Sequence, residues 1–203
     1  MKTETVIITS RGSGMAEALL ATEKLGADNG LAKKEKLRLR LLSEELIGLM
    51  RGIAGDVEAL YWVEQAEKKY ELHLKANVPM APEIRRQLLA ASSSGKNAAA
   101  RGFMGKLREM IAFLTLSDEQ SALASASMDL MSMGGPAGYD AGLTSYIWSL
   151  NCYKAGVRQR MAEGGAAEND WEVLERSIVA NLSDEVIVRI VGSEAEIIIA
   201  KTF

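Results

Sequence analysis

The chain has 203 residues, of which 48% are hydrophobic, so it is long enough to bury the core of one domain. Its formal net charge of −3 lacks the basic excess that is typical of a dedicated nucleic-acid-binding protein. A single cysteine, Cys152, excludes an intramolecular disulfide and favours a reducing compartment. No apolar run approaches the roughly 18 residues of a membrane span, and the first residues lack a signal core. We therefore expect a cytoplasmic protein.

The first half of the chain predicts a strand, two helices and a β-hairpin. Thr5–Ser10 is short and β-branched, which is typical of a strand. Met15–Leu25 and Lys33–Ile53 have apolar residues at helical spacing. Val57–Val63 is apolar and Tyr70–Val78 alternates apolar with polar residues, so we expect these two segments to pair as a hairpin. The clearest apolar stripe lies on the second helix and consists of Leu39, Leu42, Leu46, Leu49 and Ile53.

The second half of the chain predicts a long insertion, a helix and another hairpin. We expect a helical insertion at about residues 81–168, where glycine, alanine, serine and methionine are frequent, and Leu143–Arg160 is one of its predicted helices. Trp171–Leu182 predicts the next helix, and residues 186–202 predict a hairpin with a glycine-led turn. These elements predict one α+β domain over residues 1–203: a two-layer sandwich with a mixed, mostly antiparallel sheet and helices on one face.

Two further features indicate structure rather than chemistry. His73 is the only histidine, and it alternates with the apolar residues of its strand. Because a metal site needs several ligands, we expect His73 to face solvent and no metal to bind. Gly12 and Gly14 lie between a strand and a helix, but Glu17 takes the place of the third glycine of a dinucleotide-binding motif. We therefore expect only a turn at these glycines.

Glu44 and Glu45 are the acidic pair of greatest interest, because they lie in the middle of the second predicted helix. A carboxylate in such a place is able to act as a general base or to orient a metal-bound water. The other interpretation is an ion pair with Arg40, which lies one helical turn earlier. The residues alone leave both interpretations open.

The order of these elements resembles the ATP-binding domain shared by gyrase, heat-shock chaperones, histidine kinases and MutL mismatch-repair proteins, the GHKL superfamily. The anti-sigma factor serine kinases are most similar in size and layout. The resemblance implies a Bergerat-like fold and a bacterial signalling protein. Ser43–Gly52 is similar to the family's second-helix motif, in which a glutamate activates the attacking water and an asparagine four residues later holds magnesium. The resemblance therefore implies that Glu44 is the catalytic residue.

This chain differs from the family at the positions that hold ATP. Gly48 takes the place of the asparagine, and the Asp-x-Gly-x-Gly segment that contacts adenine is matched by Ala76, Val78 and Met80. We therefore expect no cofactor, and Mg-ATP only if the chain is an active kinase. If a nucleotide pocket is retained, the resemblance places in it Glu44, Gly48, Arg51, Ala76, Val78 and Met80.

We accordingly expect a regulatory protein with weak or no ATP hydrolysis, which is not an efficient enzyme and which binds a protein partner or a second copy of itself. Methionine packs adaptably, so the expected partner surface lies in the methionine-rich insertion, at Met128, Met131 and Met133. Two alternatives stay open: an active ATP-binding kinase of the anti-sigma or histidine-kinase type, and a structural assembly subunit. Neither nucleic acid nor a membrane is an expected partner.

Overall fold

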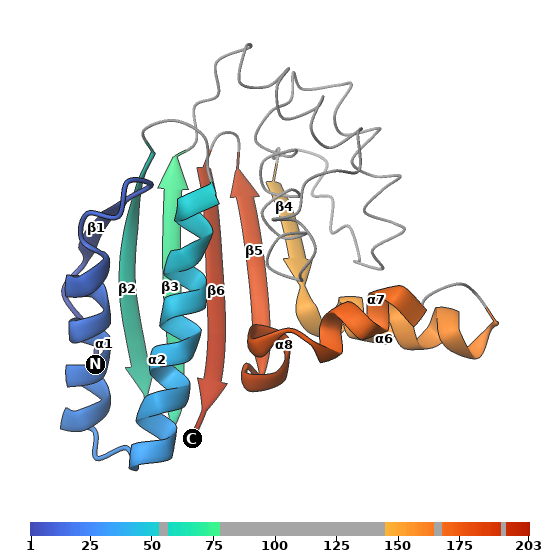
Figure 1. Ribbon diagram of the computed structural model, residues 1–203, viewed down its shortest axis with the longest axis horizontal. Helices are drawn as coiled ribbons and strands as arrows, with labels where there is room; N and C mark the ends of the chain where they lie inside the picture. The colour runs from blue at the N-terminus through green and yellow to red at the C-terminus, as the bar shows by residue number, and fades with distance from the viewer. Residues whose placement is uncertain (53–56, 78–144, 165–167, 192–193) are drawn as a thin grey trace.

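The computed structural model describes residues 1–52, 57–77, 145–164, 168–191 and 194–203 (Figure 1). These residues form an open six-stranded sheet in the order β1-β2-β3-β6-β5-β4, with helices packed on it. No helix in these ranges is long and apolar enough to cross a membrane. The strands are β1 (Val6–Thr9), β2 (Glu58–Ala66), β3 (Lys69–Asn77), β4 (Ser145–Ser149), β5 (Glu185–Val191) and β6 (Glu194–Thr202).

The first predicted strand and both predicted hairpins belong to this one sheet, as expected. The expected mixed sheet is corrected, because every described pair of strands is antiparallel. The reason lies in the connections. Two helices of opposite direction return the chain to the end of the sheet where β1 finishes, so β2 runs back beside β1 (Figure 1). The pairs β2–β3 and β5–β6 are hairpins, which are antiparallel by construction.

One face of the sheet is covered by α1 (Met15–Asp28), α2 (Lys33–Gly48) and the short α8 (Ile178–Leu182) (Figure 1). The second predicted helix ends earlier than expected, because residues 49–52 tighten into a 3-10 turn. The helices α6 (Leu150–Ala162) and α7 (Glu168–Glu175) lie instead near the edge of the sheet where β4 ends and β5 begins (Figure 1). Thus α1 lies over β1 and β2, and α2 lies over β3 and β6.

Two predicted helices need correction. Leu143–Arg160 was expected to be one helix, but residues 145–149 form β4 and only then does α6 begin. Trp148 is fully buried opposite Val188 of β5, and this burial outweighs helical propensity. Ser149 then caps α6 by accepting a hydrogen bond from the Cys152 amide at 3.3 Å. Trp171–Leu182 is likewise two helices, because Ser177 caps α8 through the Ala180 amide.

The core lies between the helix layer and the covered face of the sheet. Alternate strand residues point into it, as the period of two requires. Four residues of the α2 stripe, from Leu39 to Leu49, are buried as predicted, whereas Ile53 lies outside the described residues. The buried strand residues of this face include Val6, Ile8, Tyr61, Val63, Leu72, Leu74, Val186, Val188, Ile197 and Ile199.

A buried hydroxyl cluster joins α1, α2 and β2, and its members are Thr22, Ser43 and Tyr61, each with no exposed surface. The Tyr61 hydroxyl donates to Ser43 Oγ at 2.8 Å and lies 2.8 Å from Thr22 Oγ1. Both smaller hydroxyls also donate to carbonyls one helical turn earlier, at Ala18 and Leu39. The cluster is satisfied internally, so it fixes both helices against the sheet without an unpaired polar group.

The turn between β1 and α1 depends on glycine. Gly14 has a φ of 74°, and a Cβ there would lie 2.0 Å from the Ile7 carbonyl oxygen. No side chain fits that contact, so the close approach of the turn to β1 requires glycine. The glycine pair thus serves as a strand-to-helix turn, as expected.

Leu46→Ala is expected to lower the free energy of unfolding by about 2–5 kcal/mol, because the wild-type side chain has no exposed surface and its loss leaves a cavity. Leu37→Ala is the matched control on the same helix, since Leu37 is 56% exposed, and it should change stability by less than about 0.5 kcal/mol. Chemical denaturation followed by circular dichroism measures both values. Equal losses in the two variants would mean that the core-facing side of α2 is assigned wrongly.

Burial raises the pKa of Tyr61 to about 12, above its ordinary value near 10, so the folded state holds this proton more tightly than the unfolded chain. The resulting stability is present below about pH 10 and is lost as the pH rises from about 10 to 12. Tyr61→Phe should remove this part of the alkaline decline, at a cost of about 1–3 kcal/mol at neutral pH. Denaturation curves across that pH range test it. An unchanged alkaline decline in the variant would contradict the assignment.

Candidate functional site

Glu44 is held on the exposed side of α2, one turn after Arg40. Its Oε1 accepts a hydrogen bond from Arg40 Nε at 2.8 Å, and Arg40 also pairs with Glu23 of α1. The hydrogen bonds to Glu44 and Glu23 raise the pKa of the Arg40 guanidinium. The ion-pair interpretation of Glu44 therefore describes its surroundings, while the catalytic role implied by the family resemblance stays a prediction.

Gly48 and Ala76 are the two other described positions of the expected nucleotide pocket. Gly48 is the last residue of α2, and a Cβ added there would meet nothing within 4 Å. Neither packing nor backbone conformation therefore requires glycine, so a side chain with a metal ligand would fit. Ala76 is only 7% exposed and lies on the helix-covered face of β3, in register with Ala59 and Ala195. Its methyl group offers no acceptor to an adenine amino group.

Of the remaining predicted site residues, Arg51 alone is among the described residues. Arg51 lies in the 3-10 turn after α2. Val78 and Met80 lie outside the described residues. The same holds for the expected partner surface, which consists of Met128, Met131 and Met133.

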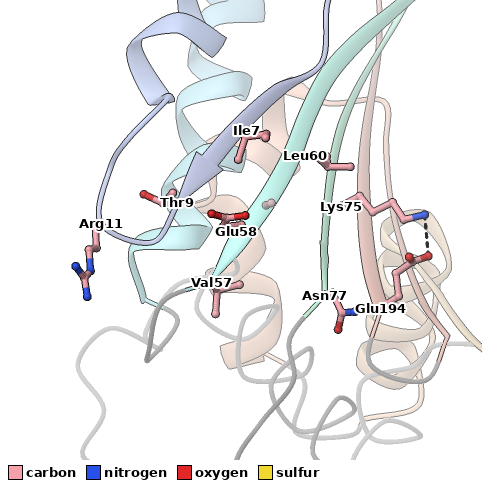
Figure 2. Close-up of a pocket in the computed structure, with 10 residues that line it drawn as sticks. Ile7, Thr9, Arg11, Val57, Glu58, Leu60, Lys75, Asn77 and Glu194 are labelled. Carbon is pink, nitrogen blue, oxygen red and sulfur yellow. Dashed lines mark ion pairs between the residues drawn. The ribbon is translucent and has the colours of Figure 1, made fainter.

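A site that the sequence analysis missed lies on the opposite face of the sheet. A cavity of about 710 Å³ opens there beside β1, β2 and β3, toward the end where β1 finishes (Figure 2). Ile7 of β1 and Leu60 of β2 are opposed in register, and they are 56% and 41% exposed. The lining residues are Ile7, Thr9, Arg11, Val57, Glu58, Ala59, Leu60, Lys75, Asn77 and Glu194.

The charges of this cavity balance. Two basic residues, Arg11 and Lys75, line it together with two acidic residues, Glu58 and Glu194. Figure 2 shows Lys75 directed at Glu194 of the next strand, where their ion pair measures 2.8 Å and raises the pKa of Lys75. Because no positive charge is in excess, the lining does not favour the phosphates of a nucleotide. Aliphatic surface beside paired charges is typical of a surface that binds protein.

The face opposite α1, α2 and α8 is called the uncovered face here, because none of these described helices lies on it, and it has two further exposed aliphatic residues at its far side. Ile147 of β4 and Val191 of β5 are 47% and 52% exposed at the far side of the sheet. Between the two aliphatic pairs, Arg189 lies 3.8 Å from Glu196, next to the pair of Lys75 and Glu194. The sequence signal was present in the alternation of each strand, since these aliphatic residues take the positions that a solvent-facing strand normally gives to polar residues.

No family model, curated protein or solved structure matches this chain. Because one fold supports many functions, the residues of the site are the evidence for what this chain does. Among the described residues, that site is the uncovered face of the sheet, with aliphatic pairs at its two sides and ion pairs between them.

Proposed function

We propose that this chain is a regulatory protein that has a GHKL-type frame, binds a protein partner and hydrolyses ATP weakly or not at all. The order of elements supports the frame: strand, two helices with Glu44 on the second, hairpin, and later a helix and a hairpin. All these strands join one antiparallel sheet with helices packed on it, which supports the α+β layout of the proposed frame.

The chemistry of the described positions supports weak use of ATP. Gly48 has no atom that could ligate magnesium, and Ala76 has no acceptor for adenine. Glu44 keeps a carboxylate, but Arg40 neutralises it at 2.8 Å on an exposed helix surface. A general base needs its carboxylate free and close to the attacking water, so this ion pair opposes catalysis.

The observation that carries the partner-binding proposal is the uncovered face of the sheet. Aliphatic side chains that are exposed to water near both edges of one sheet face raise the free energy of the protein. A partner that covered them would remove that cost. The surface also has a 710 Å³ hollow that could receive a side chain of the partner. The partner should therefore offer aliphatic side chains around a pair of opposite charges, to match Lys75 and Glu194.

Titration calorimetry with Mg-ATP should show no micromolar binding to the wild-type chain. Each missing polar contact is worth about 1–3 kcal/mol, and the metal ligand is lost as well. Gly48→Asn restores that ligand at a position with open space, so it should fold normally and bind Mg-ATP about tenfold more tightly, or better. Micromolar affinity with turnover in the wild type would favour the active kinase instead. An unchanged affinity in the variant would contradict the GHKL-type frame.

Site-specific photo-crosslinking in the native cell should capture the same protein from positions 60 and 147, which lie on the uncovered face. Leu20 and Leu37 are the matched controls, because they are 65% and 56% exposed on the helix side. The control positions should not capture that protein.

The purified partner should then bind Leu60→Glu at least tenfold more weakly than wild type and Leu37→Glu equally well. Equal capture from both sides of the molecule, or equal binding by both variants, would contradict the proposed surface. Capture of a second copy of this chain from positions 60 and 147 would favour the assembly subunit over the regulatory protein.

A further inference from the structure

His73 is buried on the uncovered face of the sheet, which corrects the expectation that it faces solvent. It is 7% exposed, although it points away from the helix layer. The cause is Trp62, which opposes His73 in register and stacks on its ring at 4.7 Å with an angle of 6° between the planes. The sequence signal was the large aromatic ring of Trp62 on the neighbouring strand, which shields the imidazole of His73 from solvent.

The two ring nitrogens of His73 have different surroundings. Nδ1 lies 3.2 Å from Glu196 Oε1 of β6. Nε2 is buried and has no hydrogen-bond partner within the described ranges. A buried polar atom without a partner is rare in a folded protein and calls for a ligand to explain it.

Two carboxylates lie on the free side of this ring. Glu71 precedes His73 by two residues on the same face of β3, and Glu64 of β2 opposes Glu71 in register. Glu196, by contrast, opposes Lys75, on the other side of His73 along the strand. Because Glu196 holds Nδ1 from that side, Nε2 is the nitrogen left on the side of Glu64 and Glu71. Ligand atoms of these three residues all lie within 4.8 Å of one another.

We propose that Glu64, Glu71 and His73 form a binding site for one divalent transition-metal ion of the Zn²⁺ type. One imidazole nitrogen with two carboxylates is a borderline ligand set, which suits Zn²⁺ better than the all-oxygen shells of Mg²⁺ or Ca²⁺. Three protein ligands leave a fourth position for water. Glu196 completes the arrangement, since a carboxylate behind a ligating imidazole fixes its tautomer and orientation.

The surroundings fit entry of an ion. A cavity of about 450 Å³ beside the site is lined by Glu64 and Glu71, together with Lys2 and Lys69. In a tetrahedral site the ligand atoms lie about 3.4 Å apart, so the carboxylates, now within 4.8 Å, have to approach by up to about 1.4 Å. The side chains of Glu64 and Glu71 are 44% and 33% exposed, which leaves room for this movement beside the stacked imidazole.

Both carboxylates already have hydrogen-bond or ion-pair partners. Glu64 accepts hydrogen bonds from Trp62 Nε1 at 2.9 Å and pairs with Lys2 at 3.1 Å, and these contacts lower its pKa. Glu71 pairs with Lys69 at 2.6 Å. A bound ion has to displace the two lysine ammonium groups, which are half exposed and able to swing into water. This competition lowers the affinity of the site for the ion.

The test is a titration of the intact, chelator-treated chain with Zn²⁺, followed by nitrogen-15 NMR of the imidazole. His73 is the only histidine, so its resonances are unambiguous. One equivalent should shift the Nε2 resonance at micromolar metal. Glu64→Gln and Glu71→Gln should each weaken binding at least tenfold, whereas Glu58→Gln and Glu194→Gln, on the same face of the sheet, should leave it unchanged.

A Zn²⁺ addition that leaves the Nε2 resonance in place would overturn the proposal. So would an affinity that appears only at millimolar metal, or one that is the same in Glu64→Gln as in Glu58→Gln. Because the NMR readout uses the wild-type chain, it decides the question even if a variant fails to fold. The result is independent of the proposed partner binding, which concerns the aliphatic residues of the same face.

Discussion

The hydroxyl of Tyr61 is the polar contact that fixes the position of two helices against the sheet. It is the only point at which α1, α2 and the sheet meet through polar groups in the described core, because Thr22 and Ser43 both lie 2.8 Å from it. Apolar packing alone allows helices to slide over a sheet, whereas a satisfied buried cluster admits one arrangement. This fixed register of the helices also sets where Glu44 and Gly48 of α2 lie relative to the sheet.

The two faces of the sheet differ in the residues that they carry. The covered face carries the hydrophobic core together with the buried hydroxyl cluster. The other face carries aliphatic pairs, ion pairs and the stacked ring of His73, and it contains both described cavities. The strands hold the side chains of this second face at fixed spacing, as a binding surface of the proposed kind would need.

The sequence predicts the covered half of this structure well and the uncovered half poorly. Leu39, Leu42 and Leu46 are repeated at helical spacing, so their burial follows from periodicity. β4 is missed because Trp148 belongs to a strand only through its partner in β5, which lies 40 residues later. The burial of His73 is missed for the same reason. Alternation predicts which face of the strand carries His73, but only the register with Trp62 shows that the indole ring covers the imidazole. Pairing across strands is long-range information, and local patterns do not contain it.

The order of strands has a consequence for how the sheet assembles. Read from either side, the sheet presents the same series: an outer strand, helices in the connection, and a hairpin whose last member lies at the centre. The halves meet where β3 and β6, each nine residues long, run antiparallel, which is the relation that a two-fold axis through the sheet would impose. The described strands are therefore arranged as two similar three-stranded units that join edge to edge, as two subunits of a two-fold dimer would. Because both units lie in one chain, the central β3–β6 contact forms within the molecule, and its formation does not depend on protein concentration as that of a dimer interface does.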